Sequence, residues 1–269
     1  MRMSLAMPAI RELEAQGYCI ATQPIVHGDI ENIPKVAGFE LLARRQNANG
    51  TVSLPGEFLP EMNQRKLATL DAFVLIEAIN HAVGASTSSP YYSFNTSFRN
   101  LSDRDFTEFM IERLSLIGPD ERARLMIEVT DGHLACTRGG SSRWRIVKRV
   151  LGRVSDLGVR VAIDNFDHNS NQMPLISEVS VSAVKLSRAA LKNQSSSGEV
   201  MDHEVLRSIV QSMVFWGCDV IADGMESMAQ VSAAKRLGAN FFQGCLFAEP
   251  LIAEDLPNTP SYLNAIPVS

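Results

Sequence analysis

Short apolar segments rich in β-branched residues alternate with helical patterns along most of this chain, and this alternation constrains the fold more than any other feature. Eight segments are predicted as strands, near residues 18–26, 36–43, 90–95, 123–129, 159–163, 182–186, 218–222 and 239–243. The link between the first two, HGDIENIPK, leaves no room for a helix and predicts a hairpin. The later gaps hold helical patterns, over residues 66–83, 103–117, 142–157, 203–217 and 227–237.

The alternation of strands and helices predicts a mainly parallel sheet whose strands are joined by crossover helices. Eight strands in one domain-sized chain of 269 residues favour an α/β fold of the closed (β/α)8 TIM-barrel type over an open sheet. The opening hairpin modifies this barrel, because it makes the first strand antiparallel to the rest. Asp103 is expected to cap a helix at its N-terminus, and Gly158, Gly217 and Gly238 stand where helix C-caps belong.

Charge and composition argue against several classes of protein. A net charge of −5 gives no support to the binding of a nucleic acid polymer. The one basic stretch fits the solvated face of a helix and consists of Arg143, Arg145, Lys148, Arg149 and Arg153. No window reaches about 18 uninterrupted apolar residues, so we expect no membrane span. The start of the chain lacks the apolar region of a signal peptide and the four cysteines are scattered, so we expect a cytoplasmic protein with free thiols.

Polar side chains lie within or directly after all eight predicted strands. In chain order they are Gln23, Glu40, Asn95, Glu128, Asp164, Lys185, Asp223 and Gln243. Any one of them is compatible with a satisfied core polar group or a helix cap, but a charge in a buried strand is costly unless it is paired or bound to a metal. Because the carboxyl ends of parallel barrel strands meet at one face, we expect these side chains to form one site there.

The types of these residues indicate a class of chemistry. Glu40, Asn95, Glu128 and Asp164 are oxygen donors, with no Cys or His at matching positions. Such hard ligands suit Mg²⁺ or Mn²⁺ better than zinc. A hard dication beside a lysine is typical of phosphate chemistry. A Schiff-base aldolase that uses Lys185 is disfavoured, because such a lysine needs a lowered pKa and its acidic neighbours oppose this.

Eight ordered motifs from about residue 17 to residue 256 resemble those of the EAL domain family of cyclic di-GMP phosphodiesterases. They are QPIV with GFELLARRQ, PGEFLP, SFNTSFRNL, IEVTD, LGVRVAIDNFD, VKLS, IADGMESMAQ and FFQGCLFAEPL. The resemblance implies residues 1–16 as an N-terminal helical arm, 17–256 as the EAL domain and 257–269 as a C-terminal tail. It also implies bacterial second-messenger signalling, in which cyclic di-GMP is hydrolysed to linear pGpG by in-line attack of water, with Mg²⁺ or Mn²⁺, and a homodimer.

The resemblance assigns roles to twelve positions. The metal ligands are Glu40, Asn95, Glu128 and Asp164, with Asn165 at a second-metal position. The catalytic residues are Glu40, Lys185, Asp223 and Glu226, and the dinucleotide contacts are Gln23, Leu42, Arg44 and Gln243. Within the catalytic set, Lys185 matches the lysine beside the attacking water, and Asp223 falls where the family has a glutamate proposed as general base or second-metal ligand.

Several positions depart from the family pattern. Asn165 replaces an aspartate that helps to hold the second metal, which removes one negative charge. Asp223 replaces a glutamate, so its carboxylate is retracted by ~1.5 Å, and a displacement of about 1 Å can cost on the order of a hundredfold in rate. The sequence DHN at 167–169 replaces a Gly-x-Gly that is thought to couple catalysis to dimerisation. Ser187 and Arg45 replace an aspartate and a tryptophan outside the inner shell of the metal.

Two hypotheses about function therefore remain open. In the first, the protein is a metal-dependent cyclic di-GMP phosphodiesterase with reduced activity, which the retained residues at the first metal position support. In the second, it is a degenerate EAL-like module that binds cyclic di-GMP or a regulatory protein partner without turnover, which Asn165, Asp223 and the altered loop support. Two interpretations of Asp167 and His168 are open. Either one of them replaces the lost ligand of the second metal, or both are solvated loop residues. The sequence shows no pattern of a sensory domain beside this domain. We therefore expect the protein to be regulated through association with another protein or through its expression level.

Overall fold

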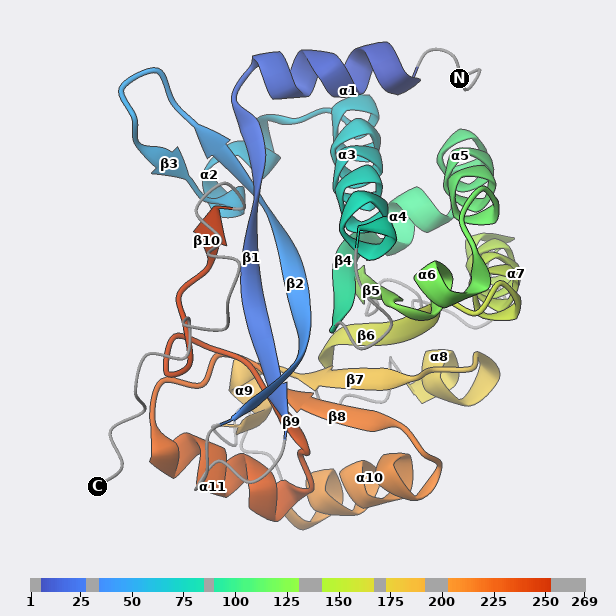
Figure 1. Cartoon of the computed structure of the whole chain (residues 1–269). Helices are drawn as coiled ribbons and strands as arrows, with labels where there is room; N and C mark the ends of the chain where they lie inside the picture. The colour runs from blue at the N-terminus through green and yellow to red at the C-terminus, as the bar shows by residue number, and fades with distance from the viewer. Residues whose placement is uncertain are drawn as a thin grey trace.

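The predicted strands form a closed barrel in the computed structural model, which describes residues 6–27, 34–84, 90–130, 142–166, 173–191 and 203–252. The barrel strands are β1 (Tyr18–His27), β2 (Lys35–Gln46), β4 (Tyr91–Ser97), β5 (Leu125–Thr130), β6 (Arg160–Phe166), β7 (Ala183–Leu186), β8 (Asp219–Ala222) and β9 (Phe241–Phe242). Closure comes from β1, which pairs with β2 on one side and with β9 on the other. Two short strands, β3 (Val52–Ser53) and β10 (Leu251–Ile252), pair antiparallel with β2 and β1, respectively (Figure 1).

The directions of the strands confirm the predicted modification of the barrel. β1 is antiparallel to both of its barrel neighbours, whereas every neighbouring pair from β2 through β9 is parallel. The predicted hairpin is also confirmed, since β1 and β2 pair from Tyr18 opposite Arg45 to His27 opposite Lys35, with one register shift between Ile25 and Val26. The residues that link these two strands, 28–33, lie outside the described part of the chain.

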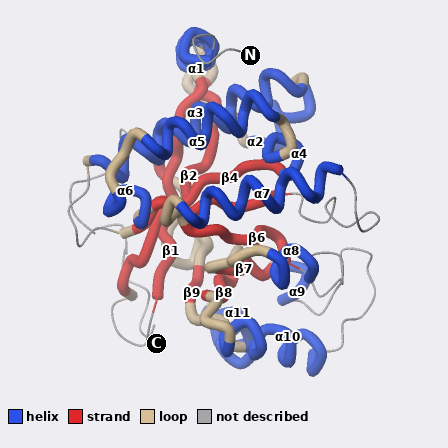
Figure 2. Tube along the Cα trace, turned by 90° about the vertical axis from the view of Figure 1, so that its right-hand side faces the viewer, coloured by secondary structure: helices blue, strands red, loops and turns tan. Residues whose placement is uncertain are grey.

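Helices cover the outside of the barrel (Figure 2). They are α1 (Ala6–Ala15), α2 (Pro55–Phe58), the 3₁₀ turn η2 (Leu59–Glu61), α3 (Gln64–Val83), α4 (Phe98–Leu101), α5 (Arg104–Ser115), α6 (Pro119–Ala123), α7 (Ser142–Asp156), α8 (Met173–Glu178), α9 (Arg188–Leu191), α10 (His203–Phe215) and α11 (Met228–Leu237). The five predicted helices correspond to α3, α5, α7, α10 and α11. None of the described helices combines the length and the apolar character that crossing a bilayer requires.

The predicted helix caps are present. The Asp103 carboxylate accepts a hydrogen bond from the backbone N–H of Phe106 at 2.9 Å, which caps α5. Gly238 ends α11 with φ 114°, a left-handed conformation that favours glycine. Gly158 and Gly217, after α7 and α10, also have positive φ.

The α5 cap makes a measurable contribution to stability. Replacing Asp103 with Ala should lower the free energy of unfolding by about 1 kcal/mol, because the Phe106 N–H loses its side-chain acceptor. Urea denaturation of the two proteins measures this difference. Asp103→Asn, which keeps an acceptor oxygen, should lose much less; equal losses in both variants would show that the cap hydrogen bond is not what Asp103 contributes.

The core has two layers, one outside and one inside the barrel. The outer layer joins the strands to the helices and includes most of the buried apolar residues. The inner layer consists of the fully buried side chains of Ile25, Met126, Ala162, Ala183 and Ile221. Tyr91 and Phe241 pack against it, and a Cβ at Gly38 would stand 2.4 Å from the Tyr91 ring, so glycine there leaves room for the aromatic ring. The polar side chains of the barrel interior lie next to this apolar layer.

Candidate active site

The polar residues predicted at the strand ends lie directly above the inner apolar layer. Successive side chains of a strand point to opposite faces, so residues two apart share a face. Two positions beyond Met126, Ala162, Ala183, Ile221 and Phe241 come Glu128, Asp164, Lys185, Asp223 and Gln243. β1 runs in the opposite direction, so its inner polar residue, Gln23, comes two positions before Ile25 and pairs opposite Glu40. The same alternation that packs the barrel therefore places these groups together.

Lys185 is the centre of this cluster. Its ammonium lies 2.9 Å from Glu40 Oε2 and 2.8 Å from Glu128 Oε2. The side chains are almost inaccessible to solvent, with 2% of Lys185, 7% of Glu40 and 0% of Glu128 exposed. Three charged groups at such depth are stable only because each has a charged partner within hydrogen-bond distance.

Glu40 is held by two amides as well as by the lysine. Asn95 Nδ2 donates to Glu40 Oε1 at 2.7 Å, and Gln243 Nε2 donates to Glu40 Oε2 at 2.6 Å. Gln243 Nε2 also donates to Gln23 Oε1 at 3.1 Å, and Gln23 Nε2 donates to the carbonyl of Ala248 at 3.0 Å. Six of the twelve predicted site residues, Lys185 included, thus belong to one hydrogen-bonded network.

The carboxylates of this cluster carry more negative charge than the single ammonium of Lys185 compensates, and the pKa values of these groups are shifted accordingly. Burial alone would raise the pKa of Glu40, but Lys185, Asn95 and Gln243 together hold that pKa below its usual value. Burial raises the pKa of Glu128 to about 8, with the nearby charge of Glu40 adding to the effect. Burial and Glu40 also raise the pKa of Asp164 to about 6, although Lys185 opposes them. Burial would lower the pKa of Lys185, but the carboxylates around it raise that pKa well above its ordinary value. One ammonium cannot neutralise three carboxylates.

This surplus of negative charge suits a dication. Among the described residues, the buried Oε1 atom of Glu128 has no hydrogen-bond donor, so one oxygen of this carboxylate is left without a partner. Carboxylate and amide oxygens are the donors that Mg²⁺ and Mn²⁺ prefer. Within the described ranges no three acidic, His or Cys side chains converge as ligands, and the Lys185 ammonium is paired with both Glu40 and Glu128. The donor set fits a hard cation, and the lysine competes with it for the same oxygens.

In the absence of metal, the free energy of unfolding of the protein should fall as pH rises. The folded-state pKa values of Glu128 and Asp164 lie above their ordinary values of 4.5 and 3.8, so the folded protein binds more protons than the unfolded chain. The stability that this provides is complete at low pH and is lost as pH rises through about 6 and then about 8. Urea denaturation in EDTA across this range measures the slope. Glu128→Gln should lose the upper part of the slope, and an unchanged slope in that variant would contradict the assignment.

Asp164 and Asn165 occupy an irregular end of β6. The register between β6 and β7 shifts between Ile163 and Phe166, and Asn165 has φ 51°. Asn is one of the few residues other than glycine that accept this left-handed conformation. Its side chain is exposed, and its Nδ2 donates to Asp164 Oδ2 at 2.8 Å. The amide therefore supports Asp164 and supplies no negative charge of its own.

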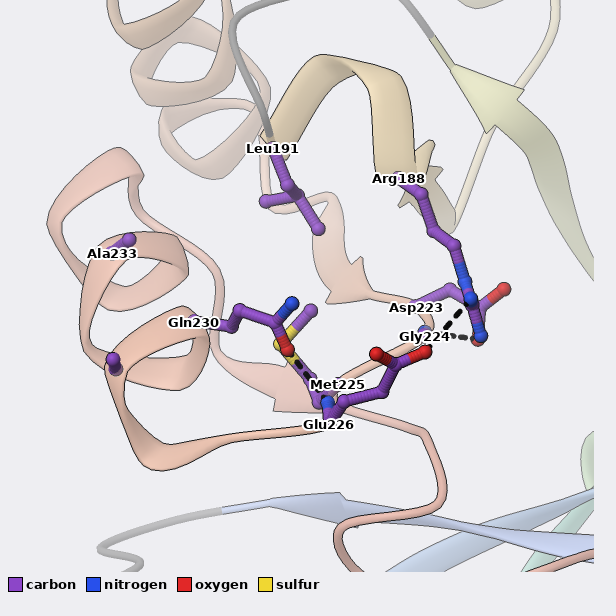
Figure 3. A pocket seen from close by; sticks show the side chains of 9 residues that line it. Arg188, Leu191, Asp223, Gly224, Met225, Glu226, Gln230 and Ala233 are labelled. Carbon is purple, nitrogen blue, oxygen red and sulfur yellow. Dashed lines mark hydrogen bonds and ion pairs between the residues drawn. The ribbon is translucent and has the colours of Figure 1, made fainter.

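Asp223 and Glu226 belong to a second group of side chains, which lines a pocket (Figure 3). Asp223 Oδ1 accepts from the backbone N–H of Gly224 at 2.7 Å, and Glu226 Oε1 pairs with Arg188 Nη1 at 2.9 Å. These residues line a pocket of about 250 Å³ between α9 and α11, whose wall includes Leu191. Asp223 lies near enough to Lys185 to contribute to its raised pKa, but the Glu226 side chain is 56% exposed and is held to one side.

Sequence reasoning missed Arg188, which forms an exposed ion pair with Glu226. A Cβ added at Gly224, where φ is 72°, would collide with the Arg188 side chain, so arginine and glycine fit together here. The sequence signal that could have identified Arg188 is its position, two residues after a barrel strand. Two departures from the family pattern have local structural roles: Ser187 Oγ accepts from Ala190 N–H at 3.0 Å, and the Arg45 guanidinium lies 5.5 Å from the centre of the Tyr18 ring.

The remaining predicted contacts lie along β2. Glu40, Leu42 and Arg44 are two residues apart and share one face of the strand. Arg44 is buried and donates to the carbonyl of Ala43 at 2.9 Å; burial lowers its pKa, while Glu40 acts in the opposite direction. Leu42 is half-buried. The altered loop residues Asp167, His168 and Asn169 lie outside the described part of the chain.

Comparison with known proteins relates this chain to a family. A family model described as "EAL domain" matches residues 9–250. The signaling protein YkoW of Bacillus subtilis is 23% identical over 230 residues, which cover 82% of this chain and 27% of YkoW. MucR of Pseudomonas aeruginosa, a bifunctional diguanylate cyclase/cyclic di-GMP phosphodiesterase, is 25% identical over 223 residues, covering 81% of this chain and 31% of MucR. The chain therefore spans about a third or less of the length of these relatives.

Solved structures with the same fold support the barrel assignment. An EAL domain protein from Listeria monocytogenes superposes with a TM-score of 0.69 at 24% identity, covering 93% of this chain and 94% of that one. The MucR phosphodiesterase in complex with cyclic di-GMP gives 0.74 at 22% identity, covering 94% and 100%. The FimX EAL domain of Pseudomonas aeruginosa bound to cyclic di-GMP gives 0.72 at 18% identity, covering 96% and 100%. These likenesses confirm the predicted modified TIM-type barrel.

Proposed function

This chain belongs to the EAL domain family, and we propose that it acts on cyclic di-GMP by metal-dependent hydrolysis of one phosphodiester to give pGpG. The observation that carries the proposal is the buried network in which Lys185 bridges Glu40 and Glu128 while Asn95 and Gln243 hold Glu40. Such a concentration of charge is costly for folding, and catalysis by a cation-binding site gives a reason to retain it.

The groups of this site suit hydrolysis of a phosphodiester. The residues proposed to hold Mg²⁺ or Mn²⁺ are Glu40, Asn95, Glu128 and Asp164. The chemistry that such a cation supplies is polarisation of a phosphoryl oxygen and acidification of water. The Lys185 ammonium would stay charged beside the reacting phosphate and offset its developing negative charge. We assign to Asp223 the acceptance of a proton from water.

The substrate would be oriented by groups at the edge of the buried cluster. Gln23 and Gln243 offer amides next to Glu40, and Arg44 carries a cation on the same face of β2. A guanidinium is suited to phosphate oxygens, with which it forms paired hydrogen bonds. Leu42, between Glu40 and Arg44 on this face, supplies an apolar contact.

Specific observations also favour the second candidate function, binding of cyclic di-GMP or a regulatory protein without turnover. Asn165 adds no charge for a second metal and bonds to Asp164, while Glu226 is paired with Arg188. Two-metal chemistry needs both ions to stabilise the attacking and leaving oxygens. In this alternative the buried network binds one cation or none, and the dinucleotide stays intact.

One experiment separates the two candidates. Purified protein is incubated with cyclic di-GMP and either Mg²⁺ or Mn²⁺, and pGpG is followed by chromatography while binding is measured by calorimetry. We expect pGpG to form slowly and its formation to stop in Glu40→Gln. Binding without pGpG at any metal concentration would overturn the hydrolase proposal and leave the binding module; neither binding nor turnover would overturn both.

The further expectations about assembly and location are also proposals. We propose a homodimer, by analogy with other EAL proteins, which sedimentation velocity of the purified chain tests. A cytoplasmic location is proposed on the basis of the scattered cysteines, of which Cys19, Cys218 and Cys245 form no disulfide with one another in the described part of the chain. The division of the chain at residues 16 and 256 stays a prediction.

A further inference from the structure

The outer face of α7 carries a concentration of positive charge that the proposed hydrolase does not use. Five cations are exposed on this helix: Arg143, Arg145, Lys148, Arg149 and Arg153. The opposite face packs into the core through side chains such as Val147 and Leu151. In the described ranges only Lys148 of the five has an acidic partner, Glu178 at 2.9 Å. Figure 2 shows α7 lying across the outside of the barrel wall, between α5 and α8.

This arrangement of charge opposes the stability of α7 itself. Arg145 and Arg149 are four residues apart, as are Arg149 and Arg153, so like charges are neighbours on the helix surface. The first turn has no acidic residue, and the helix macrodipole disfavours cations such as Arg143 there. Departures from these local rules are expected at functional sites, and the described part of the fold offers α7 one acidic partner, Glu178. The chemistry of α7 requires a ligand of this face to be anionic.

A groove runs beside these cations. It has a volume of about 480 Å³ and lies between α7 and the connection from α8 to β7, and its lining includes Ser155 and Ser180. Gly152, in the middle of α7, lines it, and a Cβ at this position would meet nothing within 4 Å. Glycine inside a helix costs stability relative to alanine, and no packing contact requires it here. The glycine keeps the groove open beside Arg145 and Arg149.

We propose that this groove and the cations of α7 bind an acidic segment of a partner protein. A polypeptide can place carboxylates against Arg145 and Arg149 and N–H or hydroxyl donors against Glu178 and Asp156, which also line the groove. A polynucleotide presents phosphate at every unit, and these two acidic groups and the net charge of −5 oppose it. A membrane surface is disfavoured because the apolar face of α7 is already buried in the core and cannot insert.

Fluorescence anisotropy with a labelled glutamate-rich peptide tests the proposal on the full chain. The double variant Arg145→Glu, Arg149→Glu should bind the peptide at least about tenfold more weakly, because two attractive pairs become repulsive. The matched control is Arg11→Glu, Arg65→Glu, which changes net charge equally at exposed positions on α1 and α3. The control should keep wild-type affinity. No binding by the wild type, or equal losses in the two variants, would overturn the proposal.

A second variant separates the groove from simple charge. Gly152→Gln should fill the groove and weaken peptide binding, yet raise the melting temperature by about 2–4 °C through better helix propensity. Weaker binding in a more stable protein cannot be explained by misfolding. Unchanged binding would contradict the groove. Anisotropy with labelled oligo-dT and sedimentation with phosphatidylserine vesicles test the other partners, and tighter binding of either by the wild type, lost in the α7 double variant, would overturn a protein partner.

Discussion

Replacing Lys185 with Met should lower the free energy of unfolding of the metal-free protein by about 3–5 kcal/mol. The ammonium is the shared partner of Glu40 and Glu128, which are 7% and 0% exposed. Methionine has a similar length but no charge, so it preserves packing while it leaves the two carboxylates facing each other without a cation. Breaking a buried ion pair from one side is more costly than never having it, because the remaining charge has lost its water. Urea denaturation in EDTA at about pH 9, where Glu128 with its pKa of about 8 is ionised, measures the loss.

A double variant identifies the source of this cost. Lys185→Met combined with Glu128→Gln removes the more completely buried carboxylate together with its partner. It should recover most of the lost stability, since Asn95 and Gln243 still hold Glu40. The cost of Lys185→Met should also shrink as pH falls below about 8, because Glu128 is then protonated and needs no cation. If the double variant were no more stable than the single one, the compensation of Glu128 by Lys185 would be wrong.

Restoring two acidic side chains should raise hydrolysis of cyclic di-GMP by roughly tenfold to a hundredfold. Asp223→Glu extends the carboxylate by ~1.5 Å toward the dinucleotide, and a shift of this size changes rates on the order of a hundredfold. Asn165→Asp adds the missing negative charge, and aspartate, like asparagine, tolerates the φ of 51° at this position. Formation of pGpG in excess Mn²⁺ measures the rate, and calorimetry measures whether Mn²⁺ binds more tightly.

The control for this restoration is Ser187→Asp. It also returns an acidic family residue near the strand ends, but Ser187 caps α9 through Ala190, and aspartate can cap equally well. We therefore expect little change in rate. An equal gain from Ser187→Asp would show that net charge, and not the second-metal position, limits turnover. No gain from the Asn165 and Asp223 changes would show that the defect lies elsewhere.

Much of the fold could be predicted because its signals are local. The eight strands were predicted from runs of apolar and β-branched residues, and the antiparallel first strand followed from the short link to the second. The cap at Asp103 was read from one residue type at a helix start. The short elements β3, β10, α2, α4, α6, α8 and α9 were not predicted, since each is too short to show a period.

The candidate site was predicted only in part, because residue type does not specify partners. Gln23, Glu40, Asn95, Glu128, Lys185 and Gln243 were predicted as one group, and the structure joins them in one network. The motif predicted a catalytic role for Glu226 as well as for Asp223. In the structure, however, Glu226 is exposed and is paired with Arg188. Nothing in the local pattern distinguishes a glutamate that faces a lysine from one that faces an arginine outside the cluster.

The sequence by itself determined the period of the strands, the chemistry of each inward-facing position and the family of the chain. The tertiary structure decided which carboxylates share Lys185, why the pKa of Glu128 rises to about 8 and where Asn165 bends β6. These depend on distances between residues far apart in the chain: Lys185 meets Glu40 across 145 positions, and Gln243 meets Gln23 across 220. The energy of a buried charge depends on the distance to its partner and on the exclusion of water, and both exist only after the barrel closes.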